Sequence, residues 1–202
     1  MPTLDDHLKD IAEVRSLMER SSKFLSLSGL SGISAGLVGL LGAAFAYTQT
    51  RELESLSTKA IDHTVVNLLL AALLVLILAV ALAMYFSFQM ARRKSLPLWT
   101  NVTRYLLMDL LLPLFTGGSL CLIFWYQSSF AYIAPATLVF YGLALLNASK
   151  FTVKEIRYLA VCEIILGLAA FLWLKQQLFF WSFGFGVLHI VYGILLYRKY
   201  EQ

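Results

Sequence analysis

The sequence predicts an all-α, polytopic membrane protein whose six transmembrane helices form three helical hairpins. Two observations carry most of this prediction: the amount of apolar sequence and the distribution of basic residues. Apolar residues make up 59% of the 202 positions, whereas soluble domains contain roughly 45 to 50%. The chain is therefore expected to fold largely within a lipid bilayer.

Six apolar segments are long enough to cross a hydrocarbon core of about 30 Å at about 1.5 Å per residue. These segments cover residues 24–47, 64–87, 103–125, 130–148, 157–174 and 178–197. Together they predict one transmembrane domain over residues 23–202. Residues 1–22 are rich in charge, and their apolar side chains recur on one helical face. This segment is predicted to form a cytoplasmic amphipathic helix.

Basic residues are distributed unequally between the two sides of these six spans. Only Arg51, Lys59 and Lys175 fall on one side, against thirteen on the other: Lys9, Arg15, Arg20, Lys23, Arg92, Arg93, Lys94, Arg104, Lys150, Lys154, Arg157, Arg198 and Lys199. Cytoplasmic loops carry the excess of Lys and Arg, so both termini are predicted to be cytoplasmic, in a cell (inner) membrane. The net charge of +4 then reflects membrane topology, and no nucleic-acid partner is needed to explain it.

Spans three to six suggest a repeated hairpin. Spans three and five each begin with Arg-Tyr-Leu, at 104–106 and 157–159, and continue to an acid, Asp109 or Glu163. The returning spans each contain a Tyr-Gly pair before a basic end: Tyr141 in span four and Tyr192 in span six. Repeats of this kind are common in membrane proteins. The alternative is chance similarity between apolar segments that share the same end signals.

Four glycines line one face of the first span: Gly29, Gly32, Gly36 and Gly39. Small residues let helix backbones approach closely in lipid, where packing holds helices together. This glycine face is expected to pack either against another helix of the same chain or against a second copy in a homo-oligomer.

The hairpin plan and the closing segment GVLHIVYGILLYRKY, residues 186–200, resemble the HdeD family of small acid-resistance membrane proteins. The resemblance covers mainly residues 103–199. It implies a six-span inner-membrane protein connected with acid stress, and it provides no catalytic residues to transfer. The chain differs from that family in its charged amino-terminal segment, in Asp109 with Pro113, and in His189.

Three ionisable residues fall inside predicted spans: Asp109, Glu163 and His189. Such residues are rare in membranes and usually serve function. Small residues share a helical face with Glu163 and with His189, so both side chains should point inward and come into contact. We expect the three groups to lie in the inner half of the bilayer and to form a polar cavity between spans three, five and six.

Other residues are expected to support or to neutralise these groups. Pro113 lacks the amide hydrogen that would bond the Asp109 carbonyl, so it predicts a bend in span three. Arg104 and Arg157 are alternative partners that would neutralise the acids, and tyrosines such as Tyr141 and Tyr192 could bond them or His189.

Three functions are compatible with this pattern. The first is proton-linked transport of a solute, or a response to pH, through Asp109, Glu163 and His189. The second is a scaffold or accessory subunit that binds a protein partner through residues 1–20 and the glycine face. The third, less favoured, is an intramembrane metal-dependent hydrolase. The sequence contains no phosphate-binding glycine loop, nucleophile elbow or Cys-x-x-Cys pair. We therefore expect no catalytic residues, no cofactor and no metal.

Overall fold

A computed structural model describes residues 28–53, 58–95, 97 and 99–202, with side chains omitted for 51–53 and 58–63. The amphipathic helix predicted for residues 1–22 lies outside the described residues. The described chain is helical and contains no strand: α2 (Gly29–Leu53), α3 (Thr58–Arg93), α4 (Asn101–Tyr126), η1 (Phe130–Tyr132), α5 (Ile133–Ala148), η2 (Ser149–Phe151), α6 (Lys154–Leu172), η3 (Leu174–Gln176), α7 (Gln177–Ser182), η4 (Phe183–Leu188) and α8 (His189–Tyr200). The all-helical prediction is confirmed for these residues.

Local sequence signals account for several helix ends. Thr100 caps α4, because its hydroxyl accepts a hydrogen bond from the Thr103 amide at 3.2 Å in a capping box. After α4 the chain turns at Ser128, whose φ of 56° lies in the left-handed region. The last predicted span is not a uniform α-helix, since η4 has π-helical geometry between α7 and α8. A π-helical turn widens the helix locally and is often found at functional sites.

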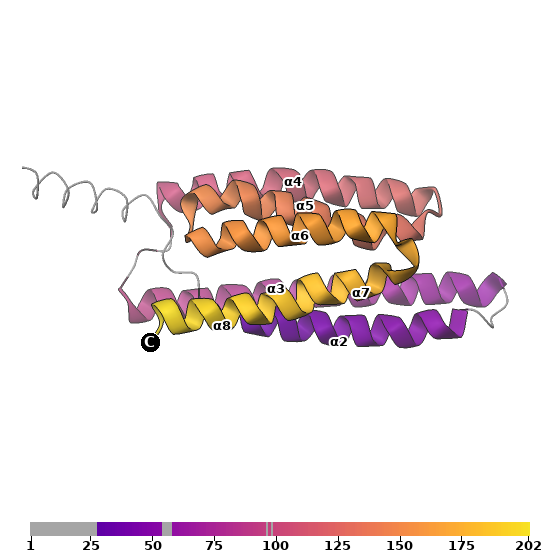
Figure 1. Ribbon diagram of the computed structural model, residues 1–202, viewed down its shortest axis with the longest axis horizontal. Helices are drawn as coiled ribbons and strands as arrows, with labels where there is room; N and C mark the ends of the chain where they lie inside the picture. The colour runs from indigo at the N-terminus through magenta and orange to yellow at the C-terminus, as the bar shows by residue number, and fades with distance from the viewer. Residues whose placement is uncertain (1–27, 54–57, 96, 98) are drawn as a thin grey trace, which may run out of the picture.

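The helices form two layers that lie side by side (Figure 1). One layer contains α4, α5 and α6, and the other contains α2, α3 and the α7–α8 segment. Within the layers α6 packs mainly on α5, α4 packs mainly on α5, and α8 packs mainly on α2. The first two predicted hairpins are therefore present as packed pairs.

The helices of the third predicted hairpin lie in different layers, and α6 contacts the α7–α8 segment less extensively than it contacts α5. Glycines explain the choice of partners. A Cβ built on Gly142 of α5 would lie 2.8 Å from the Ala160 carbonyl oxygen of α6, so α5 and α6 are in backbone contact. Gly193 of α8 lies equally close to the backbone of α2. Close backbone approach is the main source of helix association in lipid.

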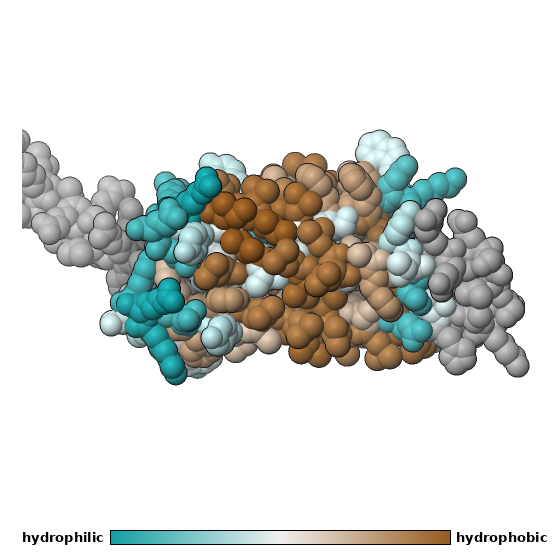
Figure 2. Space-filling view, turned by 90° about the horizontal axis from the view of Figure 1, so that it is seen from below, coloured by the Kyte–Doolittle hydropathy of each residue, from teal (hydrophilic) through white to brown (hydrophobic). Residues whose placement is uncertain are grey.

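The outer surface has the character expected of a membrane protein. A broad apolar band separates two polar ends of the molecule (Figure 2). Within the described residues, five segments are long and apolar enough to cross a bilayer: Gly29–Thr50, Thr64–Arg93, Asn101–Tyr126, Phe130–Phe151 and Leu174–Tyr200. In the Thr64–Arg93 segment none of the most apolar stretch is buried within the protein. Lipid is the natural solvent for such a surface.

The fifth predicted span, α6, has the length but not the composition of those five segments. Its 19 residues reach roughly 28 Å at 1.5 Å per residue. It also contains Lys154, Glu155, Arg157 and Glu163. The first three lie in the first turn, at the end of the molecule where α3 and α8 also finish with basic residues. We call this the basic end. Glu163 is the only acidic or basic residue in the apolar part of α6.

Candidate functional site

Glu163 lies at the midpoint of α6, nine residues from each end of the helix. Its side chain is 0% exposed. Ala160, Gly167 and Ala170 lie on the same face and are buried as well, so this small-residue face packs against the rest of the protein. At about 1.5 Å per residue, the carboxyl group is roughly 13 Å from either end of α6. Glu163 is therefore central along α6.

His189 faces Glu163 from the first residue of α8 and is also buried, with 6% exposed. Its Nδ1 atom lies 2.9 Å from the Gly184 carbonyl oxygen, and its Nε2 atom lies 2.9 Å from the Tyr141 hydroxyl. A carbonyl oxygen can only accept, so Nδ1 carries the proton. In the neutral ring Nε2 is then an acceptor, and the Tyr141 hydroxyl donates to it. Two hydrogen bonds therefore fix both the orientation and the tautomer of the imidazole.

Glu163 and His189 form a close pair between the two helix layers. The Glu163 Oε1 atom lies 3.4 Å from His189 Nδ1. Neither carboxyl oxygen of Glu163 has a hydrogen-bond partner within the described protein. Buried carboxyl oxygens are nearly always hydrogen-bonded, because an unpaired one loses the full free energy of its hydration. This unsatisfied carboxyl group is the most unusual feature of the described structure.

Glycine at position 184 leaves room for the carboxyl group. A Cβ built on Gly184 would lie 2.5 Å from Glu163 Oε2 and 2.7 Å from Leu138 Cδ2. Any larger residue at this position would therefore collide with the carboxyl group or with Leu138. The same Gly184 supplies the carbonyl that binds His189. The π-helical turn thus places two features at Gly184: the carbonyl that binds His189 and the space for the Glu163 carboxyl group.

Aromatic rings pack against the histidine. The Phe185 ring stacks on His189 with centroids 5.8 Å apart, and it also contacts Tyr141 and Trp181. The Trp181 indole donates a hydrogen bond to the Thr137 hydroxyl at 3.2 Å. Gly184 and Phe185 were not among the predicted site residues, although Trp181, Phe185 and His189 recur every four residues. This four-residue spacing places the three residues on one helical face, and it could have identified Phe185 from the sequence.

Asp109 does not join this pair, so the expected cluster of three ionisable groups is wrong. Its carboxylate lies 3.7 Å from the Lys150 Nζ atom, and its side chain is 39% exposed. The helix that carries it, α4, packs on α5 rather than on α6 and α8. Asp109 is thus a partly exposed acid whose charge is paired with that of a lysine.

The other residues expected around the cluster have separate positions. Helix α4 runs through Pro113 as one element from Asn101 to Tyr126. The helix that carries His189 is π-helical over η4. Arg104 and Arg157 are exposed, and Arg157 does not neutralise Glu163. Tyr192 is half-buried and packs on the apolar cluster around Leu159. Of the four expected supporting side chains, only Tyr141 contacts the pair.

The glycine face of α2 is occupied inside the molecule. A Cβ built on Gly29, Gly32, Gly36 or Gly39 would lie between 2.3 and 3.0 Å from an atom of the α8 or η4 segment. The contacting atoms are largely backbone, such as the Gly186 and Phe185 carbonyl oxygens. A partner protein or a second copy could not use this face without displacing the last helix.

The described part of the chain offers no three-ligand metal site. No three His, Cys, Asp or Glu side chains within it come together closely enough to hold an ion. A catalytic zinc site usually needs three protein ligands. Asp109, Glu163 and His189 could have supplied three, but Asp109 lies apart from the other two.

Comparisons with known proteins provide no further guide to this site. No family model, curated protein or solved structure matches the chain. The interpretation therefore depends on what the geometry shows: a membrane-type helical protein with an unsatisfied acid beside a histidine at its centre.

Proposed function

We propose that this chain is a six-span membrane protein in which Glu163 and His189 take up and release protons, for proton-linked transport or a response to pH. The observation that carries the proposal is the buried Glu163 carboxyl group, whose two oxygens have no hydrogen-bond partner. A structural acid in an apolar interior would be paired. Ionisable groups at membrane depth are usually part of an ion or proton pathway.

The small space around the carboxyl group favours a proton over a larger cation. Leu138 and Gly184 are close to it on one side, and the protonated Nδ1 atom of His189 faces it on another. A metal or organic cation needs several oxygen ligands in addition to room. The His189 Nδ1 atom carries a proton that it donates to Gly184, so it offers no lone pair to a cation. A proton needs only one lone pair.

The hydrogen bonds of His189 suit it to pass a proton to Glu163. A proton that reaches Nε2 makes the ring an imidazolium, and the ring then has N–H groups on both sides. Loss of the Nδ1 proton to the Glu163 carboxylate 3.4 Å away breaks the hydrogen bond to the Gly184 carbonyl and leaves a neutral acid and a neutral histidine protonated on Nε2. Neutralising both groups removes the unfavourable free energy of charge in an apolar interior.

The membrane topology is part of the same proposal. With α6 as a sixth span, both termini lie on one side of the membrane. The described basic residues at the basic end, including Arg92, Arg93, Arg198 and Lys199, support a cytoplasmic location for that side. The resemblance to acid-resistance membrane proteins is consistent with a proton-binding role, since such proteins act where the proton concentration changes.

Proton flux into proteoliposomes tests the proposal. Purified protein is reconstituted with a pH-sensitive dye inside the vesicles, and an acid pulse or a potassium diffusion potential drives protons inward. We expect wild-type protein to acidify the interior faster than protein-free vesicles, and Glu163→Gln to abolish the difference. Glutamine keeps the shape of the side chain but cannot carry the proton.

Asp109→Asn is the matched control, because it neutralises another acid of the spans that lies outside the pair. It should retain wild-type flux. Equal flux for wild type and Glu163→Gln, or equal loss in Asp109→Asn and Glu163→Gln, would contradict the proposal.

A further inference from the structure

A second group of contacts joins the two layers at the basic end. Glu155, in the first turn of α6, accepts hydrogen bonds from the Lys199 ammonium group and from the Tyr200 hydroxyl, the latter at 3.1 Å. Both donors belong to the last turn of α8. We call this group the Glu155 contact. It connects the same two helices that carry Glu163 and His189.

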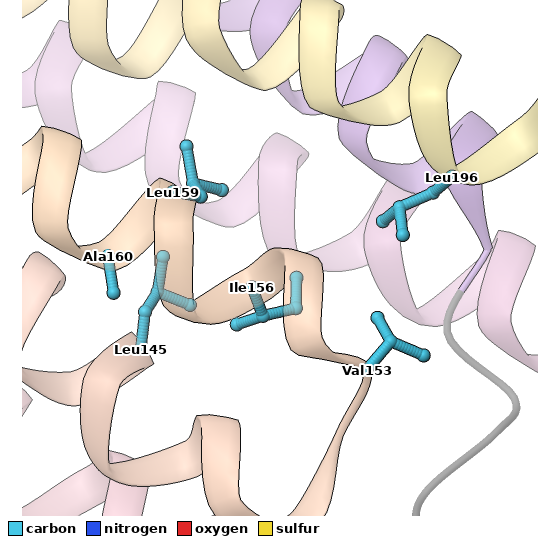
Figure 3. Close-up of a cluster of buried hydrophobic side chains, with 6 residues drawn as sticks. All are labelled: Leu145, Val153, Ile156, Leu159, Ala160 and Leu196. Atoms are coloured by element: carbon cyan, nitrogen blue, oxygen red, sulfur yellow. The ribbon is translucent and has the colours of Figure 1, made fainter.

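Apolar side chains fill the space between the Glu155 contact and the proton-binding pair. Figure 3 shows Ile156 and Leu159 on α6 and Leu196 on α8, in one buried cluster with Val153, Leu145 and Ala160. Ile156 and Leu159 lie between Glu155 and Glu163 along α6, and Leu196 lies between His189 and Lys199 along α8. The order inward from the basic end is thus a polar contact, an apolar layer and the pair.

These two helices are not held together by close packing along their length. α6 packs mainly on α5, and α8 packs mainly on α2. Separating α6 from α8 at the basic end would break the Glu155 contact and a few apolar contacts, while each helix kept its main partner. The π-helical η4 segment, which ends at Leu188 next to His189, provides a point where the last helix can bend.

From this arrangement we infer that the Glu155 contact is a gate: it holds α8 against α6 and excludes water from the route between the basic end and the Glu163–His189 pair. The inference rests on the proposed function, because it assigns a control point to the same proton-binding site. Release of Lys199 and Tyr200 from Glu155 admits water past Ile156, Leu159 and Leu196.

A native thiol can report the opening. Cys162 precedes Glu163 on α6, is partly buried and lies within electrostatic range of the Tyr192 hydroxyl on α8. The chain has only two cysteines, so Cys121→Ser leaves Cys162 as the one thiol. A negatively charged methanethiosulfonate reagent reacts with a thiolate in water. Its rate of reaction with Cys162 in liposomes therefore measures water access.

We expect Glu155→Ala and Lys199→Met, each in the Cys121→Ser background, to raise the labelling rate by about tenfold, as a shift in an open–closed equilibrium would. The charge-swapped double variant Glu155→Lys with Lys199→Glu should return the rate towards the wild-type value. Lys154→Ala is the matched control, since Lys154 is an exposed neighbour at the same end of α6, and it should label like wild type.

Proton flux measured on the same vesicles separates this inference from the proposed function. Faster labelling together with faster flux in Glu155→Ala supports the gate. Unchanged labelling overturns the gate, whatever Glu163→Gln does to flux. Faster labelling with unchanged flux also overturns it, because the opened route would not lead to the proton-binding pair. Loss of flux in Glu163→Gln tests only the proposed function.

Discussion

The last helix of the protein has two faces that are built differently. Towards α2 it presents Gly186 and Gly193, and the two backbones come into direct contact with the glycine face of α2. Towards α5 and α6 it presents His189, Leu196 and Lys199, which meet the other layer through side chains. His189 and Leu196 are buried, whereas Lys199 is exposed at the basic end. The two faces therefore hold the helix in different ways.

The difference shows how one helix can be fixed and movable at the same time. Backbone contact between glycines leaves no side chain that can adjust, so the α2 face defines a single packing. The α5 and α6 face depends on a few polar contacts and a thin apolar layer, which can separate and re-form. Four substitutions test this contrast between the two faces, and their expected effects decrease from the first to the last.

Gly193→Ala should be the most damaging of these changes. The new Cβ would lie 2.5 Å from the Ile33 amide nitrogen and 2.6 Å from the Gly29 carbonyl oxygen. Both are backbone atoms, so the helices must move apart. We expect a loss of about 3 kcal/mol or more, at the upper end for overpacking, seen as a lower melting temperature in detergent. Gly118→Ala, with nothing within 4 Å of its Cβ, should instead gain roughly 0.5 to 1 kcal/mol. Similar melting temperatures for both variants would contradict the contrast.

Gly184→Ala should have an intermediate effect, because the atoms in its way belong to side chains. Its Cβ would lie 2.5 Å from Glu163 Oε2 and 2.7 Å from Leu138 Cδ2. These groups can turn aside at a free-energy cost of roughly 1 to 3 kcal/mol. Displacing the carboxyl group from His189 should also reduce proton flux. A variant that is less stable but keeps full flux would show that the position of Glu163 relative to His189 is unimportant.

Glu163→Gln should change stability little, within about 1 kcal/mol of wild type, because the carboxyl group has no hydrogen-bond partner to lose. If Glu163 were a structural acid paired with an arginine, the same change would cost roughly 3 to 5 kcal/mol. Chemical or thermal unfolding in detergent distinguishes these values. A large loss of stability would assign Glu163 a structural role.

Glu155→Gln should have the smallest effect, and the effect should depend on pH. Partial burial raises the pKa of Glu155, but hydrogen bonds from Lys199 and Tyr200 and the Lys199 charge outweigh it, so the pKa lies below its usual range. A lowered pKa stabilises the folded protein at pH values above the normal glutamate pKa. The contribution disappears as pH falls through the lowered value. The melting-temperature difference between wild type and Glu155→Gln should therefore be present at neutral pH and vanish in acid. A constant difference would mean that the charge is not involved.

Much of the fold could be predicted from local sequence. Apolar length and flanking polar residues placed the ends of the last four spans within three residues and those of α2 and α3 within six. Such placement is possible because a helix that spans lipid must satisfy its own backbone hydrogen bonds. The small-residue faces around Glu163 and His189 pointed towards their contact, which the structure has at 3.4 Å. Such inferences work because a helical repeat assigns each residue to a face without knowledge of the other helices.

The errors arose where the choice of partner helix mattered. Spans five and six are neighbours in the chain, yet the glycines of α5 and α2 bring them into different layers. Asp109 resembled Glu163 in its sequence context, but α4 packs at the outside of its layer and Lys150 neutralises its acid. The π-helical turn at Phe183–Leu188 follows no pattern that was recognised in the sequence.

The sequence by itself determined the helical class, the apolar lengths and the faces on which small and ionisable residues lie, since these depend on composition and the helical period. Only the tertiary structure decided which faces meet. Helix pairing in lipid depends on how closely two backbones approach, and that closeness comes from complementary surfaces on two segments far apart in the chain. The meeting of an unsatisfied Glu163 with His189, Gly184 and Tyr141 is a result of that pairing.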